Sequence, residues 1–267
     1  MTVQERIFQT TSADGTRIGC VIEGAGPPLV LIHGTGDTHV GFRRIRPLLA
    51  RHFTLYLMDR RGRGVSGDRE AYSLDREFED VAAVVDAIAE PVNLFAHSFG
   101  AMCALEGALR ARNLRRLCCY EPSTNRLMSD RTRESTIDEM CRLIAEGDRD
   151  GVVSIHLRNI IHASEEVIER QRTQTDAWAA RLAMAHTMPR ELLALRSHPF
   201  EPERYASLSL PVRFLLGEKT VGRGPETARR LIEAIPGAEL IVLADQGHFG
   251  YITAPELVAE KLVDFFS

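Results

Sequence analysis

The chain has 267 residues, of which 44% are hydrophobic and 26% are charged, a composition typical of globular proteins. Its 33 basic and 37 acidic side chains leave a net charge of −4, which excludes a basic surface for nucleic acid and a polybasic patch for membranes. No run approaches the roughly 20 apolar residues of a membrane span, and the first ten residues lack the apolar core of a signal peptide. We therefore expect a cytoplasmic protein.

The first third of the chain alternates short apolar runs with turn residues. Residues 6–11 and 16–24 predict two antiparallel strands joined by a turn. Continuous apolar runs of the kind expected of strands buried on both faces recur at 27–34, 53–59, 92–98, 114–121, 212–218 and 238–245. The segment 75–90 carries apolar residues at helical spacing. Strands that alternate with helices predict an α/β fold with a doubly wound, mostly parallel sheet.

The rhythm changes between about Pro122 and Ser209, where helical patterns and charge replace the apolar strands. An insert of this length after a sheet strand commonly covers the ligand crevice. We therefore divide the chain into a core, residues 1–124 and 209–267, and a helical cap, residues 125–208. The alternative is a set of helices that pack on the sheet and have no role at a site.

Ser98 ends one of the apolar runs, in the pattern Ala96-His97-Ser98-Phe99-Gly100. The nucleophile elbow, G-x-S-x-G, needs small residues two before and two after the serine, because its strained strand-to-helix turn brings their backbones close together. Alanine replaces the first glycine here and is still small. Such a turn exposes the Ser98 hydroxyl and leaves the Phe99 amide at a helix start, where it can bind a developing oxyanion.

Two glycine-rich loops follow earlier strands. In "HGTG" at 33–36, we expect the backbone amide of Thr35 to be a second oxyanion donor, and the alternative is a turn with no further role. We expect His33 to support this turn. In "MDRRGRGVSG" at 58–67, Asp59 and Arg61 are expected to hold the loop rather than do chemistry.

The motifs "HGTG", "DRRGRGVS", "AHSFGA" and "ADQGHFGYITAPE" occur in this order over nearly the whole chain, and the set resembles the α/β-hydrolase fold family. The resemblance implies an eight-stranded, mostly parallel sheet, a helical cap after the sixth strand, and a triad in the order serine, acid, histidine. His248 follows the last strand, precedes a helix opened by Pro255, and matches the position of the family's catalytic histidine. It would act as general base for Ser98.

The acid of the triad is harder to assign. In most of the family it follows the seventh strand in a pattern similar to G-x-x-D, but Thr220 stands at that position here and cannot carry the required charge. Glu121 directly follows the sixth apolar strand, a position that haloalkane dehalogenases of this family use, and a strand's carboxyl end lies where parallel sheets assemble their sites. We favour Glu121, with Glu218, Asp245 or no acid as alternatives, and we expect Thr220→Ala to cost little activity.

These residues predict acyl transfer. Ser98 would attack an ester carbonyl, the Thr35 and Phe99 amides would hold the oxyanion, and water would release the acid. We expect a small to medium, largely apolar substrate. This mechanism requires no metal and no organic cofactor. The five cysteines show no CxxC pairing, which argues against zinc or a disulfide framework, and neither lysine is next to Ser98, which argues against Schiff-base chemistry.

Three other reactions use the same residues: thioester hydrolysis, C–C bond hydrolysis and perhydrolysis. A ligand-binding receptor with little turnover is a further alternative, suggested by the substitutions at Ala96 and Thr220. Neither the substrate nor the oligomeric state follows from the sequence.

Overall fold

The computed structural model describes residues 6–125, 131–220 and 224–267. This description leaves out residues 1–5 at the start of the chain and residues 126–130 of the expected cap. The expectation about a signal peptide concerned a segment that includes residues 1–5. The chain forms two compact units. The first contains residues 1–34, 38–123 and 201–267, and the second contains residues 35–37 and 124–200. Within the described part of the chain, no helix is long and apolar enough to cross a membrane.

The first unit is built on an eight-stranded sheet of order β1-β2-β4-β3-β5-β6-β7-β8. Its strands are β1 (Arg6–Thr11), β2 (Arg17–Gly24), β3 (Pro28–Ile32), β4 (Thr54–Met58), β5 (Val92–His97), β6 (Leu114–Tyr120), β7 (Val212–Gly217) and β8 (Glu239–Leu243). Only the pairs β1·β2 and β2·β4 are antiparallel, and the remaining neighbours run parallel. The predicted α/β class and mostly parallel sheet are therefore confirmed.

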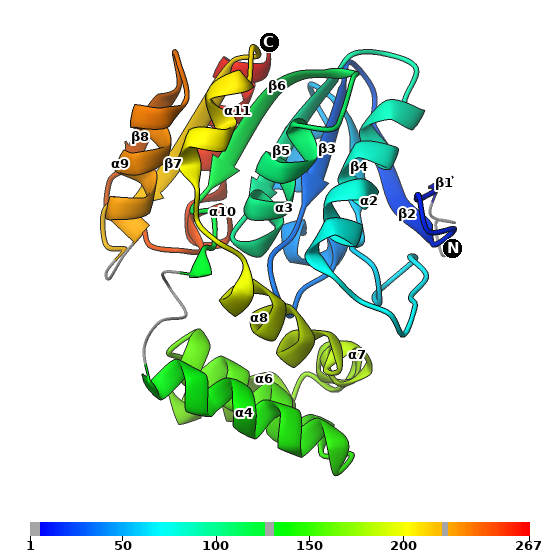
Figure 1. Ribbon diagram of the computed structural model, residues 1–267, viewed down its shortest axis with the longest axis vertical. Helices are drawn as coiled ribbons and strands as arrows, with labels where there is room; N and C mark the ends of the chain where they lie inside the picture. Colours follow the sequence, from blue (N-terminus) through cyan, green and yellow to red (C-terminus); the bar gives the residue numbers. More distant parts are fainter. Residues whose placement is uncertain (1–5, 126–130, 221–223) are drawn as a thin grey trace. The chain divides into compact units, whose positions relative to one another are not determined.

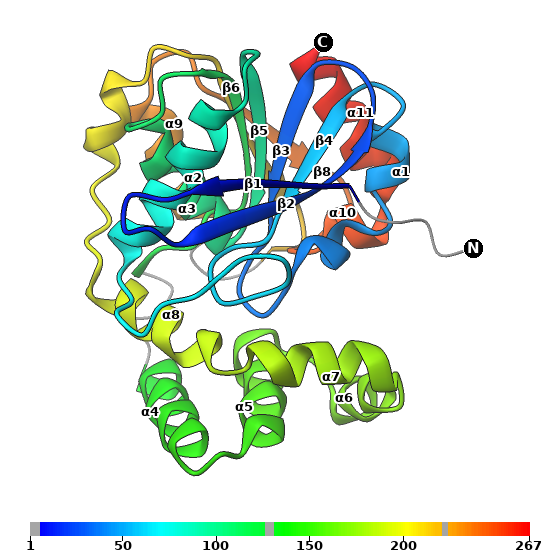
Figure 2. The same ribbon diagram turned by 90° about the vertical axis from the view of Figure 1, so that its right-hand side faces the viewer.

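Helices cover both faces of this sheet, which explains why its central strands are continuous apolar runs. All residues of β3, β5 and β7 are buried, as expected for strands without a solvent face. Figure 2 shows α2 (Leu74–Ala87), α3 (Phe99–Ala108) and α9 (Gly224–Ala234) on one side of the sheet. On the other side lie α1 (Arg46–Leu49), α10 (Gly250–Thr253) and α11 (Pro255–Phe266).

The main core lies between the sheet and α11. Alternate residues of the central strands, such as Leu29 and Leu31, point into it together with Phe95 and meet Leu262 and Phe266 from the helix. Because side chains of a strand alternate between its two faces, the other residues of the same strands face α3, which packs on β3, β5 and β6. This rigid layer holds the carboxyl ends of the parallel strands in place.

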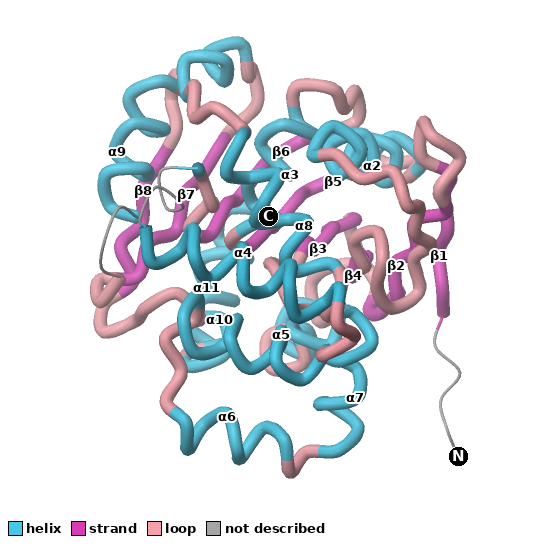
Figure 3. Tube along the Cα trace, turned by 60° about the horizontal axis from the view of Figure 1, so that its bottom comes forward, coloured by secondary structure: helices cyan, strands magenta, loops and turns pink. Residues whose placement is uncertain are grey.

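The second unit is helical throughout its regular structure (Figures 1 and 3). Its elements are α4 (Arg131–Ala145), α5 (Arg149–Ile155), a π-helix (His156–Ile160), α6 (Glu165–Arg172), α7 (Thr175–Met184) and α8 (Thr187–Ser197). Asp150 joins three of these helices, since it accepts hydrogen bonds from Arg172 and from Trp178 Nε1. Val152, Ile168 and Trp178 are buried around this junction.

The carboxyl-terminal boundary of this unit differs from the sequence-based one at residue 208. The compact unit ends at Phe200, and the short 3-10 helix η4 (Pro202–Ser207) belongs to the sheet unit. The reason is a polar contact with α3: Tyr205 donates to Glu106 Oε1 at 2.9 Å, and Arg204 pairs with Oε2 of the same carboxylate at 3.1 Å. Glu106 is a buried residue of α3 in the sheet unit. Its contacts with Tyr205 and Arg204 therefore hold η4 to that unit.

Replacement of residues 125–200 by a flexible Gly/Ser linker should leave the sheet unit folded, because every strand and the α11 core lie outside that span. Far-ultraviolet circular dichroism and urea unfolding, compared with the full chain, would measure this. A cooperative transition with retained strand signal is the expected result. Loss of all folded structure would show instead that the helical unit is part of the folding core.

Candidate active site

Ser98 stands at the turn between β5 and α3 with a backbone that few residues other than glycine adopt. Its φ is 55° and its ψ is −119°, a region that costs about 1–3 kcal/mol for a residue with a side chain. Hydrogen bonds on both sides hold it there: the Ser98 amide donates to Tyr120 O at 2.9 Å, and the Met102 amide donates to Ser98 O at 3.2 Å. A strained strand-to-helix turn therefore stands at Ser98.

The small residues around Ser98 have identifiable steric causes. A Cβ atom on Gly100 would lie 2.4 Å from His33 O and 2.8 Å from Ile32 O, closer than any real contact. A Cβ atom on Gly34 would lie 3.1 Å from the Cβ of Ser98. The backbone of the 33–34 turn thus passes directly beside the elbow, where a bulkier residue would force the two apart.

His248 and Glu121 complete a chain of hydrogen bonds that starts at Ser98. His248 Nε2 lies 3.1 Å from Ser98 Oγ, and Nδ1 lies 2.6 Å from Glu121 Oε2. Because an ionised carboxylate only accepts hydrogen bonds, it holds the proton of a neutral imidazole on Nδ1. The lone pair of Nε2 is then directed at the Ser98 hydroxyl, which is the arrangement that a general base requires.

Glu121 is held by the end of β7 as well as by the histidine. Its Oε1 accepts hydrogen bonds from the Gly217 amide at 2.8 Å and from Thr220 Oγ1 at 2.5 Å. The residue is buried and has a φ of 47°, so the chain turns sharply after β6. The expectation that Thr220→Ala costs little changes here, because the Thr220 hydroxyl is one of the donors that fix this carboxylate.

The other two candidate acids make different contacts. Glu218 accepts a hydrogen bond from the Asp245 amide at 2.9 Å, and the Asp245 carboxylate pairs with Lys219 at 3.0 Å. Both carboxylates thus lie along the turn after β7 and β8, in contact with each other's segment. Of the three candidates, Glu121 is the one whose carboxylate contacts His248 Nδ1.

Sequence reasoning missed two side chains that hold the His248 loop. His97 donates from Nε2 to His248 O at 2.8 Å, and burial, with His248 nearby, lowers the pKa of His97 well below its ordinary value. Tyr120 donates to Gly247 O and accepts from the Gly250 amide. A usable signal was present in the sequence: a polar ring ends each of two neighbouring apolar strands, directly before Ser98 and directly before Glu121.

The two expected oxyanion donors lie in different units. Phe99 is the first residue of α3, so its amide has no intrahelical acceptor. Thr35 follows Gly34 in the chain and belongs to the second unit, and its role as a donor stays a prediction. His33 donates from Nδ1 to Gly34 O at 2.8 Å and accepts from the Arg60 amide at 3.2 Å, so it ties the 33–34 turn to the next loop.

The loop after β4 is organised by its charged side chains. The Asp59 carboxylate accepts hydrogen bonds from the His39 amide at 2.7 Å, from His39 Nδ1 at 2.8 Å and from the Val65 amide at 2.9 Å. Arg61 is buried and pairs with Asp80 of α2 at 2.7 Å. Both residues thus hold the loop, in line with the role expected from their position after a strand.

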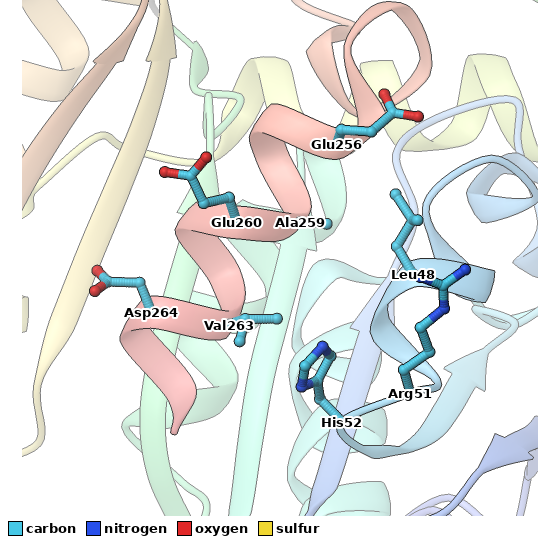
Figure 4. A pocket seen from close by; sticks show the side chains of 8 residues that line it. All are labelled: Leu48, Arg51, His52, Glu256, Ala259, Glu260, Val263 and Asp264. Atoms are coloured by element: carbon cyan, nitrogen blue, oxygen red, sulfur yellow. The ribbon is translucent and has the colours of Figure 1, made fainter.

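Among the described residues, no group of three or more His, Cys, Asp or Glu side chains could bind a metal ion. An open pocket of about 450 Å³ is lined by α11 and by the segment from α1 to His52 (Figure 4). None of the side chains that line it contacts Ser98, His248 or Glu121 in the hydrogen-bond chain described above.

Comparison with known proteins identifies the family and the fold. The model of the Alpha/beta hydrolase family matches residues 29–261. The structure is similar to an alpha/beta hydrolase from Sphaerobacter thermophilus, with a TM-score of 0.82 and 32% identity over 97% of this chain and 100% of that chain. It also has the fold of the esterase RhEst1 from Rhodococcus, with a TM-score of 0.75 and 19% identity over 97% and 98% of the two chains.

A curated relative matches only a short segment. The protein named "Probable oxidoreductase EphD" from Mycobacterium tuberculosis is 38% identical over 98 residues, which are 34% of this chain and 17% of that protein. The chain thus spans less than a fifth of the length of that relative.

The tight approach at the elbow predicts a large difference between two glycine substitutions. Gly100→Ala should destabilise the fold by about 1–3 kcal/mol, because its Cβ would overlap backbone oxygens of β3 and its loop. Gly247→Ala is the matched control, since a Cβ there meets nothing within 4 Å. Urea unfolding of both variants would measure the difference, and equal stabilities would contradict the close approach.

Proposed function

The chain belongs to the α/β-hydrolase family, and from this premise we propose that it is a serine hydrolase that cleaves a carboxylic ester through an acyl-enzyme. The observation that carries the proposal is the continuous hydrogen-bond chain from Ser98 Oγ through His248 to Glu121. A packing role would not require a serine with a strained backbone at the end of this hydrogen-bond chain. The hydrolase assignment is that of the family, and the serine mechanism is our proposal.

In the first half of the reaction, Ser98 attacks the ester carbonyl. Its O–H bond breaks, the proton moves to His248 Nε2, and a bond forms between Ser98 Oγ and the carbonyl carbon. The imidazolium that results is stabilised by the Glu121 carboxylate on its other nitrogen. His248 then gives the proton to the departing alcohol, and an acyl group remains on Ser98.

The second half repeats these steps with water. His248 Nε2 takes a proton from water, which attacks the acyl carbon, and the bond to Ser98 Oγ breaks as that oxygen regains a proton. In both halves a negative charge develops on the carbonyl oxygen. The Phe99 amide at the start of α3 is proposed as one donor to it, and the Thr35 amide as the other.

The relocated acid performs the same electrostatic task as an acid on β7. What matters for catalysis is a carboxylate at Nδ1, because it selects the imidazole tautomer and stabilises the positive charge. The Gly217 amide and the Thr220 hydroxyl then keep Glu121 Oε2 aimed at the ring by binding Oε1. Thr220 is thus proposed as a positioning residue.

Ser98→Ala should lower ester turnover by several orders of magnitude, because the nucleophile is lost. Hydrolysis of a p-nitrophenyl ester and labelling by a serine-directed fluorophosphonate, located by peptide mass spectrometry, would measure this. Ser207→Ala is the control, since it removes an exposed hydroxyl from η4. Unchanged turnover in Ser98→Ala would contradict the elbow assignment, and a wild-type protein with neither activity nor labelling would favour a ligand-binding receptor.

Glu121→Gln should lower kcat by about 10²- to 10⁴-fold, because its amide donates to the ring and favours the tautomer that cannot act as base. Thr220→Val keeps the shape and removes one hydrogen bond to the carboxylate, so a loss of about 10-fold is expected. Glu218→Gln is the matched control and should stay within about twofold. If Glu218→Gln and Glu121→Gln lose activity equally, the acid is misassigned.

A further inference from the structure

Ser123 is a buried hydroxyl residue in direct contact with Ser98. Its Oγ lies 3.1 Å from Ser98 Oγ, and its amide donates to Ser98 O at 3.1 Å. The side chain belongs to the same compact unit as the elbow and is only 8% exposed. The ester mechanism derived above makes no use of it.

The short segment Glu121-Pro122-Ser123 reaches both ends of the hydrogen-bond chain. Glu121 contacts the far nitrogen of His248, and Ser123 contacts the oxygen of Ser98. Backbone hydrogen bonds hold the segment at both ends, since the Glu121 amide donates to Leu215 O and the Ser123 amide donates to Ser98 O. The ring of Pro122 fixes the backbone angle φ between these two residues, which restricts the movement of Glu121 and Ser123 relative to each other.

The direction of the hydrogen bond between the two serines follows from the proton on His248. With its proton on Nδ1, the ring has only a lone pair on Nε2, and Ser98 must donate its single proton there. The Ser98 oxygen then has lone pairs left to accept. Ser123 therefore donates to Ser98, and the chain runs Ser123 to Ser98 to His248.

We propose that Ser123 is a further catalytic residue, whose hydroxyl stabilises negative charge on Ser98 Oγ when that oxygen attacks and again when it leaves. The inference rests on the serine mechanism proposed above. Ser123 keeps its own proton throughout. During acylation its O–H donates to Ser98 Oγ as the proton of Ser98 moves to His248 and the bond to carbon forms.

The same hydrogen bond serves the second half of the reaction. When the acyl-enzyme is hydrolysed, the bond between Ser98 Oγ and the acyl carbon breaks, and the electron pair goes to Oγ before His248 returns a proton. A donor already in place lowers the energy of this leaving oxygen. A hydrogen bond to a charged group contributes about 1.5–3 kcal/mol, which corresponds to about 10- to 100-fold in rate.

The alternative is a structural role, in which Ser123 only holds the Ser98 side chain in one rotamer before attack. The two roles separate in the two half-reactions. A rotamer lock speeds only acylation, because Ser98 is covalently held in the acyl-enzyme. A donor to Oγ speeds acylation and deacylation alike.

The test compares wild type with Ser123→Ala, which removes the donor, and Ser123→Cys, which keeps a weak one. Acylation is measured as the rate constant of the pre-steady-state burst of p-nitrophenolate, which leaves the p-nitrophenyl ester as Ser98 Oγ bonds to the acyl carbon. Deacylation is measured as the decay of the acyl-enzyme formed with a p-nitrophenyl ester, followed by mass spectrometry. Ser207→Ala is the control for loss of a hydroxyl, and thermal unfolding checks that each variant is folded.

For Ser123→Ala we expect both rate constants to fall by about 10- to 100-fold, with Ser123→Cys between this variant and wild type. Deacylation of Ser123→Ala within twofold of wild type overturns the proposal, whether or not its acylation is slower. These outcomes differ from a failure of the serine mechanism itself, which would show as a wild-type protein that is neither labelled at Ser98 nor active on the ester.

Discussion

The carboxylate of Glu121 is the constraint around which the site is organised. Its two oxygens bind His248 Nδ1, the Gly217 amide and the Thr220 hydroxyl, and it thereby joins the ends of β6, β7 and the loop after β8. Its backbone has to adopt a φ of 47° to do so. A buried carboxylate without these donors would be costly, so its position depends on all three contacts being made together.

The β7 position that carries the acid in most of the family has an altered task in this chain. A carboxylate at position 220 would lie beside the Glu121 carboxylate. The repulsion between the two negative charges would raise the pKa of one of these groups. Thr220 avoids that repulsion and supplies a donor instead. In the proposed mechanism, Glu121 at the end of β6 supplies the charge at His248, and Thr220 after β7 supplies a hydroxyl donor to that carboxylate.

The loop that carries His248 is also held by side chains at strand ends. His97 and Tyr120 are opposite each other in the register of β5 and β6, and both bind backbone atoms of the loop that carries His248. A site is held most accurately when its supporting groups stand on rigid elements. Burial lowers the pKa of His97 well below its ordinary value, so this support stays a neutral donor rather than a second base.

The sequence was sufficient for the fold class, for Ser98 at its elbow and for the loop position of His248. These features depend on local patterns: apolar runs predict strands, and a small-x-Ser-x-Gly turn between strand and helix admits few conformations. The end of the helical unit at Phe200 did not follow from the sequence, because the contacts of Tyr205 and Arg204 with Glu106 join residues far apart in the chain.

The sequence by itself determined which residues could serve as nucleophile, base and acid, because each requires a particular side chain at a strand end. Only the tertiary structure decided between Glu121, Glu218 and Asp245 as neighbours of His248, and only it brought Thr220, Ser123, His97 and Tyr120 into the same cluster. The physical reason is that parallel strands distant in sequence end at one edge of the sheet. Which side chains meet there depends on backbone direction at each strand end, as the left-handed turn at Glu121 demonstrates.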